Sequence, residues 1–173
     1  TLTVKGLLGN TYLTVDVGAT YSLEGGDDTI GNIAGAGNIH IPSGDTLTLN
    51  TNTNSTFSGV ISGPSGDVGG NLVKSGSNIL TLSGINTYAG TTTINGGAIS
   101  ISADSGLGSA PGSATAGHLI LNGGTLQSTT SFPLNSNRGI TLGSSDGVFN
   151  TSSGILTYDG IIAGSNDLTK SGT

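Results

Sequence analysis

Short stretches in which large apolar residues alternate with small polar ones recur along the chain. This period of two is typical of a β-strand with one buried face. The clearest examples are TLTV at 1–4, TLTLN at 46–50, NILTLSG at 78–84, TTTING at 91–96, AISIS at 98–102, HLILNGG at 118–124 and GITLG at 139–143. Helical periodicity is nearly absent, because the one candidate, ISADSGLGSAPG at 101–112, is interrupted by Gly and Pro. We therefore predict an all-β protein with a loop over 101–112.

Several segments recur along the chain. The matched pairs are SGVISG at 58–63 with DGIIAG at 159–164, NLVKSGS at 71–77 with DLTKSGT at 167–173, TINGGAI at 93–99 with ILNGGTL at 120–126, and residues 79–88 with 1–12. A sandwich gives no reason for such continuity, whereas a solenoid requires it, because each coil stacks on the next. With about twenty residues per coil, the chain makes roughly eight turns of a parallel β-helix. We predict one β-helix segment over 1–173, a slice of a longer array that starts and stops within a repeat.

The stretch SGINTYAGTTTINGG, residues 83–97, has few large side chains and no charge. Stacked coils need only a few such residues each. We expect five residues to point into the tube or stack along it: Leu80, Leu82, Ile85, Tyr88 and Ile94. The match of GNTY at 9–12 with INTY at 85–88 further predicts equivalent positions for Tyr12 and Tyr88, and equivalent bends at Asn10 and Asn86.

The composition of the chain excludes or argues against several classes of protein. The chain has 32 Gly but only four Pro and no Gly-X-Y period, which excludes collagen. Charged residues are only 8% while β-branched residues are frequent, which argues against disorder. A net charge of −6 with four Lys and Arg residues argues against a nucleic-acid partner. No signal segment or apolar run of membrane-spanning length occurs, and the absence of Cys excludes disulfides and thiolate chemistry.

The candidates for catalysis are few and scattered. A polysaccharide lyase or hydrolase needs clustered carboxylates with a cation or His nearby. Here the Asp residues stand mostly alone beside Gly or Ser, where local backbone hydrogen bonds in turns explain them: Asp16, Asp27, Asp28, Asp45, Asp67, Asp104, Asp146, Asp159 and Asp167. We expect Arg138, His40 and His118 to be surface or strand-edge side chains rather than catalytic groups. We assign no catalytic, cofactor-binding or metal-binding residue and predict that the protein is not an enzyme.

Two further hypotheses rest on local patterns. EGGDDTIGNIAGAGN at 24–38 resembles one turn of a glycine–aspartate calcium repeat, with Glu24, Asp27 and Asp28 as oxygen ligands. Asn32 and Asn38 stand where further Asp would be wanted, so one imperfect copy is a weak signal. The pairs Thr1 with Thr3, Thr46 with Thr48 and Thr91 with Thr93 project to one side of their strands and would form an ice-binding face if stacked in regular rows. Thr is also an ordinary strand residue, which favours a structural role.

Residues 59–99, with GVISG followed by NLVKSGSNILTLSGINTYAGTTTINGGAI, resemble the passenger-associated repeat of bacterial autotransporters. Partial copies cover 159–173 and, more loosely, 1–23. The resemblance implies a right-handed parallel β-helix that is exported and displayed on the bacterial surface or released outside the cell. It also implies that any membrane attachment is through a β-barrel that is not part of this sequence.

We therefore predict a non-enzymatic extracellular rod that serves as a stalk, spacer or adhesive surface, without a cofactor. Its expected partners are host or surface glycans or proteins, or further copies of the chain stacked end to end into a fibre. A carbohydrate-active or carbohydrate-binding β-helix is the alternative, and ice binding is a minor one.

Overall fold

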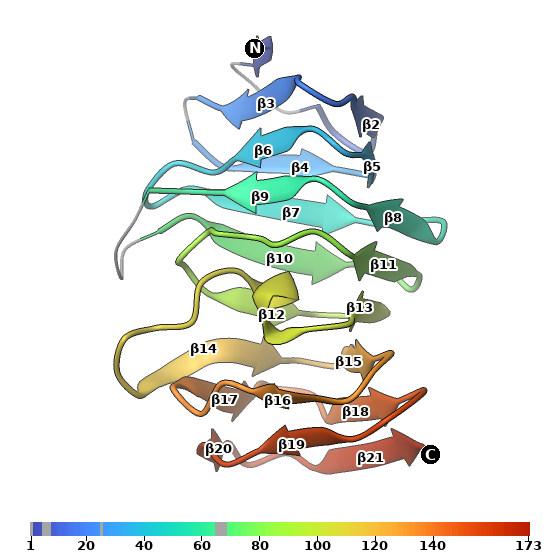
Figure 1. Ribbon diagram of the computed structural model, residues 1–173, viewed down its shortest axis with the longest axis vertical. Helices are drawn as coiled ribbons and strands as arrows, with labels where there is room; N and C mark the ends of the chain where they lie inside the picture. Colours follow the sequence, from blue (N-terminus) through green and yellow to red (C-terminus); the bar gives the residue numbers. More distant parts are fainter. Residues whose placement is uncertain (1, 5–7, 25, 65–68) are drawn as a thin grey trace.

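The chain winds into a right-handed parallel β-helix, as predicted (Figure 1). The structure is a computed structural model that describes residues 2–4, 8–24, 26–64 and 69–173. Every strand pair in these ranges is parallel and joins one coil to the next. The chain enters at one end of the stack and leaves at the other, so sequence order is also the order along the axis.

The strands form three faces. The eight-stranded face consists of β2 (Tyr12–Val15), β5 (Asn32–Gly35), β8 (Ser55–Phe57), β11 (Ile79–Leu82), β13 (Ala98–Ile101), β15 (Thr125–Ser128), β18 (Gly147–Thr151) and β21 (Leu168–Gly172). The seven-stranded face consists of β4 (Asp28–Ile30), β7 (Thr46–Asn50), β10 (Asn71–Ser75), β12 (Thr92–Ile94), β14 (Thr115–Leu121), β17 (Arg138–Leu142) and β20 (Ile162–Ala163).

The third side of the coil changes along the axis. A four-stranded sheet occupies it first, formed by β1 (Leu2–Val4), β3 (Thr20–Leu23), β6 (Asn38–His40) and β9 (Val60–Ser62). Later come a single 3₁₀ turn, η1 (Asp104–Leu107), and the pair β16 (Phe132–Leu134) and β19 (Leu156–Tyr158). The segment 101–112, expected to be a loop, therefore contains this one turn of 3₁₀ helix.

All seven alternating stretches contain strands of the structure, and TLTLN coincides with β7. The coils differ in length, from 18 residues between the paired positions Thr20 and Asn38 to 27 between Ala98 and Thr125. Because most coils exceed twenty residues, the eight rungs of the longest face enclose about seven full turns rather than eight.

The interior is a continuous column of aliphatic side chains with Phe57 and two tyrosines. Leu80, Leu82, Tyr88 and Ile94 are buried, as expected. Ile85 is 70% exposed, so its predicted inward position is wrong. Asn86 turns inward in its place, where its amide accepts a hydrogen bond from Ile61 N at 2.8 Å and donates one to Gly106 O at 2.8 Å. Since adjacent residues point to opposite sides of an extended chain, Ile85 faces solvent.

The predicted equivalence of the two NTY segments is also wrong. Tyr12 opens a strand of the eight-stranded face and is 55% exposed, whereas Tyr88 is fully buried. Asn10 is exposed and Asn86 is buried. The other buried tyrosine is Tyr21, whose register column runs through Ile39 to Ile61, and the carbonyl of Ile61 accepts from Tyr88 N.

The matched sequence segments lie on different faces of the coil. NLVKSGS contributes to β10 on the seven-stranded face, whereas DLTKSGT contributes to β21 on the eight-stranded face. Likewise, residues 2–4 form β1 of the four-stranded sheet, while the similar residues 79–82 form β11 of the eight-stranded face. A strand of one sequence type therefore fits more than one side of the tube.

Candidate functional site

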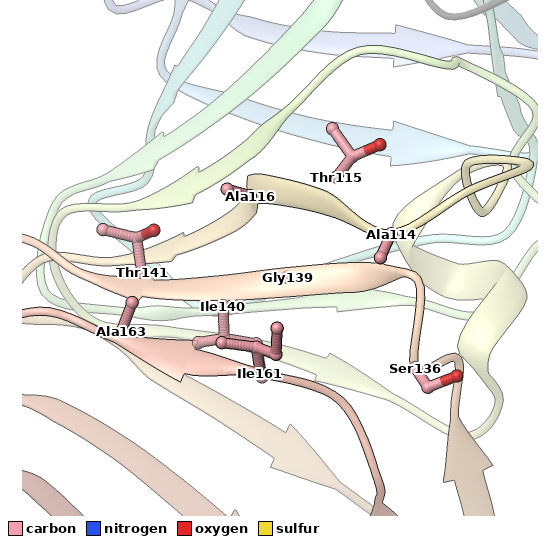
Figure 2. A pocket seen from close by; sticks show the side chains of 9 residues that line it. All are labelled: Ala114, Thr115, Ala116, Ser136, Gly139, Ile140, Thr141, Ile161 and Ala163. Atoms are coloured by element: carbon pink, nitrogen blue, oxygen red, sulfur yellow. The ribbon is translucent and has the colours of Figure 1, made fainter.

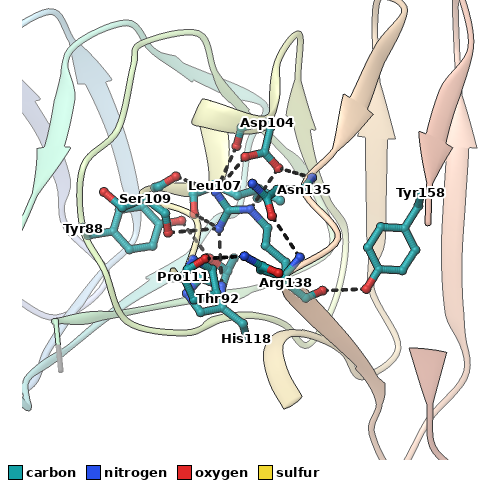
Figure 3. A network of polar contacts seen from close by, with 12 residues as sticks. Tyr88, Thr92, Asp104, Leu107, Ser109, Pro111, His118, Asn135, Arg138 and Tyr158 are labelled. Atoms are coloured by element: carbon teal, nitrogen blue, oxygen red, sulfur yellow. Dashed lines mark hydrogen bonds and ion pairs between the residues drawn. The ribbon is translucent and has the colours of Figure 1, made fainter. Parts of the chain in front are cut away.

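The densest polar cluster surrounds Arg138, the first residue of β17 (Figure 3). Its guanidinium forms a bidentate ion pair with Asp104, with Nε at 2.9 Å from Oδ1 and Nη2 at 3.0 Å from Oδ2. Nη2 also donates to Gly108 O at 2.6 Å, and Nη1 donates to Leu107 O at 3.0 Å. Asp104 opens η1, so this arginine holds the turn and the loop behind it against the coil.

The sequence had led us to expect surface or strand-edge side chains at Arg138 and His118. The structure corrects this prediction, because both side chains are buried. Arg138 is fully buried, and His118 is 4% exposed with its Nδ1 at 3.4 Å from Arg138 Nη1. His40 is half-buried on β6, and its Nδ1 lies 3.3 Å from Ser62 Oγ. All the guanidinium nitrogens of Arg138 already donate within the protein, which favours a structural role over binding of an anionic substrate.

Four of the eight aspartates in the described ranges form side-chain hydrogen bonds across coils, which corrects the local-turn prediction for Asp27, Asp28, Asp104 and Asp146. Asp27 Oδ1 accepts from Thr46 N at 2.8 Å, and Asp146 Oδ1 accepts from Asp167 N at 3.0 Å. Asp104 Oδ1 also accepts from Asn135 N, 31 residues further along the chain. Asp16 and Asp45 do lie in turns closed by main-chain hydrogen bonds, Asp159 is exposed, and Asp67 lies outside the described residues.

The 24–38 segment uses its acidic residues in the same way. Asp28 is 4% exposed; its Oδ1 accepts from Leu8 N at 3.0 Å, and its Oδ2 accepts from the Tyr21 hydroxyl. Glu24 is exposed. Within the described ranges, no three His, Asp or Glu side chains lie together in a way that could hold a metal ion. Asp28 thus serves as an internal acceptor of hydrogen bonds.

Lys74 was not singled out by the sequence reasoning, yet it is fully buried in β10. Its register partners are Leu49 and Ile94, which belong to the apolar interior. The ammonium donates to three carbonyl oxygens, those of Ser75 at 2.6 Å, Gly76 at 3.0 Å and Gly96 at 3.2 Å. Gly96 belongs to the next coil, so Lys74 fastens two successive turns. The alternation in Leu72-Val73-Lys74 was the available signal, because it places Lys74 on the same side as Leu72.

The hydroxyl groups of the two buried tyrosines form hydrogen bonds with residues of the same register column. Tyr88 Oη lies 2.8 Å from Thr92 Oγ1, and the Tyr21 hydroxyl donates to Asp28. Asp28 and Thr92 belong to one register column of the seven-stranded face, linked through Leu47 and Leu72. Burial raises the pKa of Tyr88 to about 12. Burial is the largest cause that raises the pKa of Tyr21, and the hydrogen bond to Asp28 and the charge of Asp28 raise it further.

These buried groups predict an unusual response to alkaline pH. Burial lowers the pKa of Lys74 to about 8 from its ordinary 10.5, so above pH 8 the unfolded chain binds a proton that the folded chain lacks. The free energy of unfolding then rises with pH. Above pH 10.0, the ordinary tyrosine pKa, the unfolded chain loses protons that Tyr21 and Tyr88 retain in the folded chain, and the free energy of unfolding falls.

Urea titrations across this pH range should show a maximum of the free energy of unfolding near pH 10. A Lys74→Met variant should lack the rise and keep the fall; a rise that survives this substitution contradicts the assignment.

The outer side of the eight-stranded face is uncharged. Among its eight strands only β21 carries a charged residue, Lys170, which continues the inward column of Leu126 and Phe149. One column on the outer side runs through paired polar residues of successive coils: Thr56, Thr81, Ser100, Gln127, Asn150 and Ser171. Ser100 is covered by its neighbours and is only 4% exposed, so the other five supply the accessible groups. A shallow groove of about 390 Å³ follows this column, with Tyr12 and Gln127 among its lining residues. The face offers hydroxyls, amides and one exposed aromatic ring to a ligand.

The seven-stranded face carries two of the three predicted Thr pairs. Thr46 and Thr48 lie two rungs from Thr91 and Thr93, but Asn71 and Val73 occupy the rung between them. Thr1 lies outside the described residues, and Thr3 belongs to the four-stranded sheet. The Thr rows are therefore interrupted rather than continuous.

A small pocket of about 140 Å³ opens further along the seven-stranded face (Figure 2). Ala114, Thr115 and Ala116 form one wall, and Ile140 and Ile161 form the other. No charged or imidazole side chain is among its lining residues. This composition offers neither an acid–base pair nor a nucleophile with a base beside it.

In the described part of the chain, no helix is long and apolar enough to span a membrane.

Comparison with known proteins agrees with this architecture. The passenger-associated-transport-repeat family matches residues 72–101, which run from β10 through β13. The adhesin BmaC autotransporter of Brucella suis biovar 1 (strain 1330) is 33% identical over 141 residues, which are 82% of this chain but only 4% of that protein. No solved structure matches at a significant level. The chain is therefore an autotransporter passenger-repeat protein, as its sequence led us to expect, and carries its recognised repeat in the middle of the solenoid.

Proposed function

We propose that this segment is a non-enzymatic, adhesive or structural part of a passenger that is exposed on the bacterial surface or released from it. The observation that carries the proposal is the uncharged outer side of the eight-stranded face, which extends along the whole stack without an acid–base cluster. The similarity to an autotransporter adhesin supports the same function. A stack of coils held by main-chain pairing is stiff and extended, which suits a spacer as well as an adhesive surface.

The binding surface that we propose is the outward column from Thr56 to Ser171. Its hydroxyl and amide groups recur once per coil, roughly every 4.8 Å along the axis. An uncharged surface matches neutral host or surface glycans, or uncharged patches of surface proteins, better than it matches polyanions. The groove beside Tyr12 favours glycan binding as the second candidate, because an exposed aromatic ring next to hydrogen-bonding side chains suits a sugar with an apolar face and polar edges.

A binding screen with paired variants tests the proposal. The wild-type protein is assayed against immobilised neutral glycans and extracellular-matrix proteins at physiological salt. We expect a double Thr81→Lys, Gln127→Lys variant to lose the binding found for wild type, because it places two ammonium groups on the eight-stranded face. The matched variant, Thr48→Lys with Thr93→Lys on the seven-stranded face, should retain it. Binding lost only in the second variant would move the adhesive surface to the other face.

The enzymatic alternative needs a separate readout. Incubation of the same glycans with the protein, followed by measurement of newly formed reducing ends, should detect no cleavage. Release of reducing ends that depends on one of the aspartates, such as exposed Asp159, would contradict a non-enzymatic function.

Self-association is part of the proposal. In the described residues, β20 and β21 are paired on one side only, and unpaired strand edges are ready sites for pairing with another chain. A second copy stacked on this edge would make a head-to-tail contact that does not close, and the assembly would extend as a fibre. Light scattering over a wide concentration range should then show growth of the mass, whereas a constant monomer mass contradicts fibre formation.

A further inference from the structure

Two Asn-Gly pairs occupy stacked turns at one edge of the seven-stranded face. Asn95-Gly96 follows β12 and Asn122-Gly123 follows β14, whose last residues, Ile94 and Leu121, are register partners. The two side chains touch, because Asn122 Nδ2 donates to Asn95 Oδ1 at 3.0 Å. By sequence the two pairs are equivalent candidates for the same spontaneous chemistry.

That chemistry is deamidation. The main-chain nitrogen of the glycine attacks Cγ of the asparagine side chain, a new N–C bond forms, and the side-chain nitrogen leaves as ammonia. Water then opens the resulting five-membered imide at one carbonyl or the other, which yields aspartate or isoaspartate. Glycine favours the reaction because it has no Cβ to obstruct the attack, and asparagine is among the residues lost first on heating.

The structure restrains the reacting groups of the two sites differently. At the second site, Gly123 N, the atom that must attack, donates to Asp146 O at 3.0 Å. The Asn122 side chain is held as well, since its Oδ1 accepts from Ser144 N at 2.8 Å and from Ser145 N at 3.2 Å. Both reacting groups at this site must therefore break hydrogen bonds before they can meet.

The first site is less restrained. In the described residues Gly96 N donates no hydrogen bond, and the exposed side chain of Asn95 is held only by Asn122. We propose that Asn95 is a deamidation site of this protein and that Asn122 is protected. Nothing enzymatic is needed, because water is the only co-reactant and ammonia the only leaving group.

The modification would act on the connection between coils. Gly96 O is one of the three acceptors of the buried Lys74 ammonium. Isoaspartate adds one methylene group to the main chain directly before Gly96, and this displaces that carbonyl from Lys74. Aspartate keeps the main chain unchanged and replaces an amide with a carboxylate, which still accepts the hydrogen bond from Asn122. We therefore expect the isoaspartate form to be less stable than the aspartate form.

Peptide mapping by mass spectrometry tests this inference. The folded protein is incubated at mildly alkaline pH, and conversion is followed separately in the peptides that contain Asn95 and Asn122. Conversion at Asn95 should be at least about fivefold faster, the factor expected when one neutral hydrogen bond must first break at the slower site. In urea, where both turns are unfolded, the two rates should converge. Equal rates in the folded protein, or faster conversion at Asn122, would overturn the proposal.

A matched variant tests whether Gly96 N is the attacking atom, as opposed to a general loosening of the turn that would raise the rate by itself. Gly96→Ala should slow conversion at Asn95 and leave Asn122 unchanged, because the added Cβ obstructs attack by that nitrogen alone. The substitution requires only a small displacement, since the nearest atom to the new Cβ is Gly76 O at 3.2 Å and Gly96 does not have a positive φ. If Gly96→Ala leaves the rate at Asn95 unchanged, attack by Gly96 N is excluded.

Discussion

Replacement of Arg138 with methionine is expected to lower the free energy of unfolding by about 3–5 kcal/mol, the range for a buried ion pair that loses one partner. The guanidinium is 1% exposed and Asp104 24%, so water can only partly replace the lost contacts. The carbonyls of Leu107 and Gly108 lose their donors as well. Urea denaturation measures the loss, and hydrogen exchange should place the first opening at η1 and the loop behind it.

Lys170→Met is the matched control for this change. Lys170 is exposed and its ammonium donates only to carbonyls near its own position, those of Gly172 and Thr173. Its loss should change stability by less than about 0.5 kcal/mol, as is usual for surface substitutions. Equal effects of the two substitutions would contradict the role of Arg138 as the residue that holds the longest coil together.

Gly59→Ala is expected to destabilise the fold by about 3 kcal/mol, the upper end of the usual range for overpacking, because a close-packed backbone leaves no room for a methyl group. Gly37, Gly59 and Gly84 stack at one corner of three successive coils. An added Cβ at Gly59 would lie 1.9 Å from Gly37 O, and one at Gly84 would lie 1.9 Å from Gly59 O. Both obstacles are main-chain atoms, which move only if neighbouring coils separate. Thermal unfolding followed by circular dichroism measures the effect.

Gly112→Ala serves as the control, since nothing lies within 4 Å of the Cβ that it would introduce. We expect it to match or slightly exceed wild-type stability, because alanine restricts the unfolded chain more than glycine does. A Gly59→Ala protein as stable as Gly112→Ala would mean that the coils do not meet closely at this corner.

The strands were predictable from the sequence because coil stacking imposes a strict local rule. Leu47 and Leu49 in TLTLN must alternate with small polar residues for the chain to form one wall of the tube, and β7 spans those residues. The interior could be predicted where this alternation is regular. The prediction of an inward side chain failed at Ile85, where the chain turns a corner. There Asn86 takes the inward position and binds main-chain groups of two other coils.

The polar interior was less predictable, for a different reason. Arg138 and Lys74 stand at inward positions of their strands, but a charged residue at such a position is tolerated only when carboxylate or carbonyl partners are at hand. Two acceptors of Lys74 directly follow it in the chain, but Gly96 comes from the next coil and the partners of Arg138 come from η1 and the loop behind it, so only the folded chain brings these together. The equivalence of Tyr12 and Tyr88 failed because a similar segment can occupy a different face when coil lengths vary from 18 to 27 residues.

The stacking of one coil on the next is the central claim, and the absence of Cys from the chain allows a direct test by engineered disulfides. Val73 and Thr93 are register partners on the seven-stranded face, and Thr93 pairs in turn with Ile120. Cysteines at 73 and 93 should lie within the 4.4–6.8 Å Cα separation that a disulfide spans, whereas cysteines at 73 and 120 should be roughly 10 Å apart. Oxidation of the monomer should therefore close the 73–93 pair and leave the 73–120 pair as free thiols. Closure of the 73–120 pair, with 73 and 93 remaining reduced, would contradict the solenoid.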